Sequence, residues 1–104
     1  MAEGYDNIYG KLYSKANVYS GEFTTSSLAA PSDNAIIIDL PQGITYDKLL
    51  GVTFLGCQPN ATWNATLMLF KYVKQSDTAI QVSGHVSGSG TQTYTIRYLL
   101  LYKD

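Results

Sequence analysis

Two sets of side chains alternate along residues 93–103. One set is apolar or aromatic throughout and consists of Tyr94, Ile96, Tyr98, Leu100 and Tyr102. The other set begins with polar side chains and includes two leucines near the end of the segment: Thr95, Arg97, Leu99, Leu101 and Lys103. A period of two is the period of a β-strand, and aromatic and β-branched residues favour that conformation. No Gly or Pro interrupts the segment, so we predict a strand long enough to cross a small domain.

The end of this strand has apolar side chains on both faces. Leu99 and Leu101 lie opposite the predominantly aromatic set, and large exposed apolar patches are uncommon on monomers. We therefore expect Leu99, Leu101 and Tyr102 to form the interface of a symmetric homo-oligomer. In the alternatives, the two leucines lie under a loop or the N-terminal segment, or the strand is covered on both faces within one chain.

Shorter alternating or apolar segments fill the middle of the chain, separated by Pro, Gly, Ser, Asn and Asp. They predict strands over residues 17–25, 35–40, 49–57, 63–73 and 78–82, loops over 26–34 and 87–90, and a hairpin loop over 75–77. The run Ile36-Ile37-Ile38 predicts burial on both faces or a central position in a sheet. The pattern indicates an all-β domain over residues 17–104, an antiparallel β-sandwich or jelly roll of about six or seven strands.

Residues 1–16 follow a different pattern. Apolar side chains there recur at helical spacing and would make one stripe: Tyr5, Ile8, Tyr9, Leu12 and Tyr13. Gly10 weakens a helix, and an isolated helix of this length is marginal in water. The segment is thus either a short helix or an extended arm that becomes ordered against a partner, and in both cases its tyrosines need a surface.

Charge and composition exclude several classes of function. Only 14% of the residues are charged, and the net charge is -1 with no cluster of Lys or Arg, which argues against nucleic-acid binding. The sequence lacks an apolar run long enough to span a membrane, and its first residues do not resemble a signal peptide. We expect a protein made in a cytoplasm, with polar uncharged residues covering much of its surface.

The residues that could perform chemistry are few and scattered. His85 is the single histidine and Cys57 the single cysteine, so a metal site would depend on carboxylates that occur one at a time. A triad of Cys57, His85 and Asp77 can be written down, but a chain of this length supplies one by chance. We expect no catalytic site, no metal and no cofactor.

The aromatic content raises a second functional hypothesis. Trp63 with surplus tyrosines could stack against sugar rings, and the amides of Asn60 and Asn64 could bond sugar hydroxyls. Such a site would make the protein a lectin-like or receptor-binding module. Trp and Tyr are also enriched in protein interfaces and β-cores, which is the competing interpretation.

The order of segments from residue 35 onward resembles a known group of proteins. The similarity is carried by residues 35–41, by residues 50–54, by the Ser/Gly stretch 87–90 and by the aromatic closing strand. In these features the chain is similar to the small β-sandwich modules of bacteriophage virions, found in head decoration proteins, head fibres and tail fibre tips. The resemblance implies a structural protein of the virion surface or tail, usually trimeric, that docks on a capsid or tail through residues 1–16 and in some cases binds host glycans.

Overall fold

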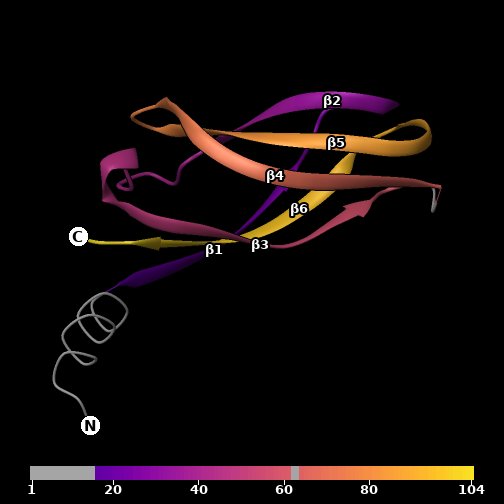
Figure 1. Ribbon diagram of the computed structural model, residues 1–104. Coiled ribbons are helices and arrows are strands. Elements are labelled where there is room, and N and C mark those ends of the chain that lie inside the picture. Colours follow the sequence, from indigo (N-terminus) through magenta and orange to yellow (C-terminus); the bar gives the residue numbers. More distant parts are fainter. Residues whose placement is uncertain (1–15, 62–63) are drawn as a thin grey trace, which may run out of the picture.

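The computed structural model describes residues 16–61 and 64–104. Within them the chain forms six strands and one short 3-10 turn: β1 (Asn17–Thr24), β2 (Leu28–Asp39), η2 (Tyr46–Lys48), β3 (Leu49–Pro59), β4 (Ala65–Ser76), β5 (Ala79–Gln92) and β6 (Tyr94–Tyr102). Figure 1 shows these strands in two layers, with β2, β5 and β4 above and β1, β6 and β3 below. The described part holds no helix long and apolar enough to cross a membrane.

The strands pair into two three-stranded antiparallel sheets. Sheet A has the order β1-β6-β3 and sheet B the order β2-β5-β4, so β6 and β5 are the central strands. The predicted all-β antiparallel sandwich is confirmed, with six strands. The choice between a short helix and an arm concerns residues 1–16, and residues 1–15 lie outside the described residues.

The core forms where the two central strands face each other. Tyr94, Ile96 and Leu100 of β6 are buried, as the alternation predicts, and sheet B contributes buried aliphatic side chains: Ile36, Ile38, Leu67, Ile80, Val82 and Val86. Burying one such side chain stabilises the folded state by about 1.5–3 kcal/mol before entropy is subtracted. The period of two along β6 therefore sets which side of sheet A faces sheet B.

Strand β2 occupies most of the predicted loop over residues 26–34. That prediction is wrong, because β2 begins at Leu28 and continues through Pro31, whose peptide bond to Ala30 is cis. The pairing of β2 with β5 is irregular between Ala30 and Ser32, and β2 is an edge strand. An edge position with an irregular register is where a strand tolerates Pro, since no ladder hydrogen bond is lost.

The apolar run in β2 is buried on one face only. Ile36 and Ile38 are in the core, but Ile37 is 48% exposed. The expectation of burial on both faces or a central position is therefore wrong. An edge strand in a two-layer sandwich has one face without a covering layer, and the sequence of the run alone does not reveal that position.

Strand β5 is much longer than predicted. The expected connection over residues 87–90 is wrong, because β5 continues through these residues to Gln92 and pairs with both β4 and β2. The hairpin between β4 and β5 is confirmed, with Asp77 and Thr78 between the two strands, and Lys74 forms an ion pair of 3.0 Å with Asp77. Gly88 and Gly90 adopt positive φ inside β5, so these glycines permit a distorted strand and not a flexible loop.

Strand β3 departs from a simple alternation. Its pairing with β6 shifts between Leu49 and Gly51 and again between Phe54 and Gly56. Each shift inserts an extra residue and reverses the faces that follow. As a result Cys57 packs against the core on the same side as Val52 and Phe54, whereas the period of two would place it on the opposite side.

Gly88 offers a test of the distorted strand. Its φ is +102°, and a Cβ at this position would lie 1.9 Å from the backbone oxygen of Asn64, which cannot move aside as a side chain can. Gly88→Ala is expected to lower the free energy of unfolding by about 2–4 kcal/mol. Gly56→Ala is the matched control, because a Cβ there meets nothing within 4 Å, and should change stability by less than about 1 kcal/mol. Urea denaturation monitored by far-ultraviolet circular dichroism measures both, and equal effects would contradict the prediction.

Candidate functional site

The outward face of sheet A carries a cluster of apolar side chains at one end. Directly opposite residues in an antiparallel pair share a face, and the register places Val18 opposite Leu101 and Ser20 opposite Leu99. Val18 is 59% exposed, and Leu99 and Leu101 are partly exposed. We call Val18, Leu99 and Leu101 the outward apolar patch. It has no covering layer among the described residues, because sheet B packs on the other side of sheet A.

The other end of the same face is polar. Arg97 of β6 donates from Nε to Oε2 of Glu22 on β1 at 3.1 Å and from a terminal nitrogen to Oε1 of Gln58 on β3 at 3.3 Å. This row crosses all three strands of sheet A. An exposed ion pair adds little to stability, so its main effect is to give the outward face one charged end and one apolar end.

Tyr102 occupies the other face of β6. The alternation along the strand groups it with Tyr94, Ile96, Tyr98 and Leu100, and it is partly exposed opposite Asn17 and Leu49. The structure therefore brings Leu99 and Leu101 together on the outward face and places Tyr102 at the strand end on the inward face.

The predicted glycan contacts are only partly within the described residues. Asn60 uses its side-chain nitrogen to donate to the Thr93 hydroxyl and its oxygen to accept from the Thr95 hydroxyl, both at 3.0 Å. The backbone oxygen of Asn64 accepts from Ser89 at 3.3 Å. Trp63 lies outside the described residues.

The predicted attachment residues precede the described part of the chain, which begins at residue 16. They are Tyr5, Ile8, Tyr9, Leu12 and Tyr13.

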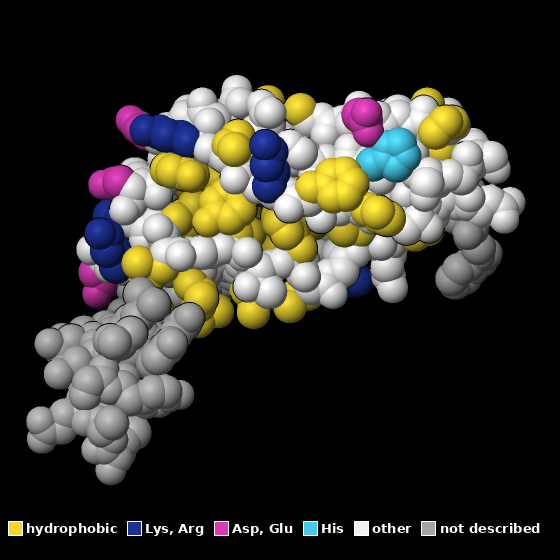
Figure 2. Space-filling view, in the orientation of Figure 1, with side chains coloured by type: hydrophobic (Ala, Val, Ile, Leu, Met, Phe, Trp, Pro, Cys, Tyr) yellow, Lys and Arg dark blue, Asp and Glu magenta, His cyan; other side chains and the backbone are white. Residues whose placement is uncertain are grey.

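A pair of polar side chains lies on the outward face of sheet B. The register sets Asp33 of β2 opposite His85 of β5, and their side chains meet at 2.6 Å between Oδ1 and Nδ1. Figure 2 shows the cyan His85 with an acidic group against it and apolar side chains along the side where β4 and β3 lie. The sequence alone does not predict this pair, because it indicates a loop at residue 33 and does not show which strands are neighbours.

The residues of the possible catalytic triad do not come together in the fold. Cys57 lies on β3 of sheet A, whereas His85 lies on β5 of sheet B and has Asp33, not Asp77, as its partner. Burial raises the pKa of the Cys57 thiol, which lowers the fraction of reactive thiolate at neutral pH. No group of three potential metal-binding side chains occurs in the described residues.

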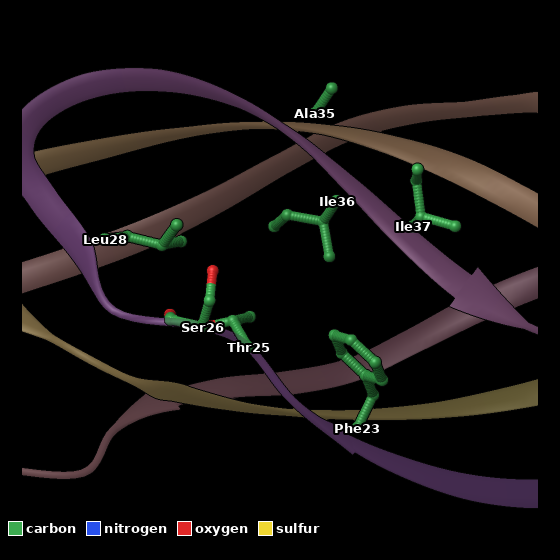
Figure 3. Close-up of a pocket in the computed structure, with 7 residues that line it drawn as sticks. All are labelled: Phe23, Thr25, Ser26, Leu28, Ala35, Ile36 and Ile37. Atoms are coloured by element: carbon green, nitrogen blue, oxygen red, sulfur yellow. The ribbon is translucent and has the colours of Figure 1, made fainter.

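A shallow depression opens where β1 passes into β2. Its volume is about 200 Å³, and it is lined by residues of both strands and their connection: Phe23, Thr25, Ser26, Leu28, Ala35, Ile36 and Ile37. Figure 3 shows the Phe23 ring extending from β1 toward Ile36. The Thr25 hydroxyl donates to the Ser26 carbonyl oxygen and accepts from the Tyr94 amide, so this polar group of the lining already has partners.

Comparison of this sequence and structure with known proteins identifies no relative. No protein-family model matches the chain, and no curated protein or solved structure matches it either.

The Cys57 thiol provides a pH test of the packing of β3. Because burial raises its pKa, Cys57 should react with Ellman's reagent several-fold more slowly at pH 8 than the urea-unfolded chain does. The difference should shrink as the pH rises through the folded-state pKa, because the folded protein then also holds a thiolate. Absorbance kinetics between pH 7 and 10 measure this. Equal rates in the folded and unfolded chains at pH 8 would contradict the packing of Cys57 against the core.

Proposed function

We propose that this chain is a non-enzymatic structural protein of a virion surface or tail that self-associates and docks on a larger assembly. The observation that carries self-association is the outward apolar patch of Val18, Leu99 and Leu101, which lacks a covering layer within the described residues. Burying the two leucines is worth roughly 1.5–3 kcal/mol each, before the cost of association is subtracted. The patch is therefore suited to contact with the surface of a second protein.

The arrangement of the outward face favours a specific contact. The patch occupies one end of sheet A, and the row of Glu22, Arg97 and Gln58 occupies the other. Protein interfaces usually combine an apolar region with polar groups at its margin, and the polar groups set the orientation of the partner. A partner that covers the patch therefore meets the charged row in a defined direction.

The virion location is supported by composition and by the resemblance of residues 35–104. Charged residues are scarce at 14%, which suits a protein whose outer faces meet other proteins. The tyrosine-rich residues 1–16 would supply the attachment to the capsid or tail. The resemblance favours a trimer, with a host glycan as a further partner.

Removing the apolar patch tests self-association. Leu99→Ser with Leu101→Ser should keep β-type circular dichroism but run as a monomer in multi-angle light scattering, because both side chains are partly exposed and lie away from the core. Ile37→Ser with Val73→Ser is the matched control, since these side chains are 48% and 41% exposed on sheet B. The control should keep the mass of the wild type. A monomeric wild type at high concentration would contradict self-association, and unfolding of the double variant would place both leucines in the core.

Deletion of residues 2–14 tests the proposed docking. Their deletion should leave the melting temperature within a few degrees while abolishing co-sedimentation with purified virus particles, because the strand framework begins at Asn17. The full chain on the same particles is the control. Full-strength co-sedimentation of the truncated chain would contradict an attachment role, and glycan-array binding by both forms would favour the lectin-like function.

A further inference from the structure

Four strands in the described residues lie at sheet edges, and three of them are interrupted. Strand β2 contains Pro31 and an irregular register, and β3 has two register shifts and ends at Pro59. Strand β4 has two register shifts and carries Lys71 and Lys74. Proline, bulges and lysine are the features by which natural sheets prevent their edges from pairing with another strand.

Strand β1 has none of these features. Its eight residues pair with β6 in one continuous register from Asn17 to Thr24, without Pro or Lys. Its single charged side chain, Glu22, is engaged with Arg97 on the outward face. Among the described residues, no strand pairs with the free edge of β1, and no further backbone hydrogen bond involves residues 17–24. This edge is therefore open to a partner strand.

We propose that the free edge of β1 pairs in antiparallel register with β1 of a second copy, about a two-fold axis perpendicular to sheet A that lies midway between the two Gly21 residues. The axis joins the two copies of sheet A into one six-stranded sheet with the order β3-β6-β1-β1-β6-β3. In this register Val18 faces Thr24 of the second copy, Ser20 faces Glu22, and no two like charges are opposite each other. The inference goes beyond the proposed function, because it requires neither a virion nor the outward apolar patch.

The inward face of β1 indicates why the second copy is the occupant. Tyr19 lies opposite buried Leu100 and is 39% exposed, and Phe23 lies opposite buried Ile96. The proposed register sets Tyr19 of each copy opposite Phe23 of the other, so two aromatic cross-strand pairs form on the core side. Phe23 also lines the depression between β1 and β2 (Figure 3).

A charge exchange at two positions tests this pairing. Val18→Lys with Thr24→Lys places like charges opposite each other twice across the axis, whereas Val18→Lys with Thr24→Glu places opposite charges there. In the isolated copy residues 18 and 24 are at the two ends of β1, and both variants change these same two residues. Because residue 24 shares the outward face with Glu22 and Arg97, circular dichroism of both variants checks that each monomer folds. At low ionic strength we expect the Lys/Lys variant to associate at least about ten-fold more weakly than the Lys/Glu variant, measured by sedimentation equilibrium.

The outcomes separate this inference from the proposed function. Equal weakening of both variants would overturn edge pairing and would indicate association through the outward apolar patch, which contains Val18. No weakening in either variant would also overturn it, as would a wild type that remains monomeric. A chain that dimerises only after deletion of residues 2–14 would overturn it too, because the protein's own N-terminal segment would then occupy the edge.

A second pair of variants tests the aromatic contact. Tyr19→Ala removes the ring that would lie opposite Phe23 of the second copy and should weaken dimerisation at least about ten-fold. Leu50→Ala is the matched control, because Leu50 is also 39% exposed and lies on β3, the other edge of sheet A, and it should leave dimerisation unchanged. Equal effects of the two variants, or none from Tyr19→Ala, would overturn the proposed register.

Discussion

The packing of β6 against sheet B is the interaction on which the rest of the structure depends. Within residues 16–61 and 64–104, strands β1 and β3 pair only with β6, so sheet A exists because β6 supplies both of its ladders. The same strand buries Tyr94, Ile96, Tyr98 and Leu100 between the sheets. A single residue, Thr93, separates it from β5, the central strand of sheet B. The two central strands are therefore consecutive in the chain and face each other across the core, and each organises its own sheet.

Sequence patterns predicted this framework well where one face is buried and the other is not. The alternation along residues 94–102 gave the strand and its inward face, because burial of every second side chain leaves a period of two. The patterns failed where an edge or an irregular register intervenes. Pro31 and the Ser/Gly stretch 87–90 look like loops, yet both lie within strands whose distortions accommodate them. Ile37 looks buried, but whether a strand is at an edge depends on residues far away in sequence.

The candidate sites show the same division. Leu99 and Leu101 could be assigned to one face from the sequence, because the assignment needs only local alternation. The pairing of His85 with Asp33 and the open edge of β1 could not be predicted, since both depend on which strands are neighbours. The edge and the outward apolar patch use different parts of sheet A, one its hydrogen-bonding groups and the other its side chains. A copy of the chain that used both surfaces would contact two different neighbours.

The antiparallel pairing of β1 with β6 also fixes how the domain bears mechanical load. Asn17 lies opposite Tyr102, and the Asn17 side chain bonds to Asp104 at 2.8 Å, so the chain enters and leaves sheet A at the same end (Figure 1). A force that pulls these two points apart acts along the ladder hydrogen bonds, which are perpendicular to the strands. The force separates the paired residues of β1 and β6 one pair after another, from Asn17 toward Thr24. A sandwich tethered at both ends would yield to a small force, whereas one held through residues 1–16 alone carries no tension across this pair of strands.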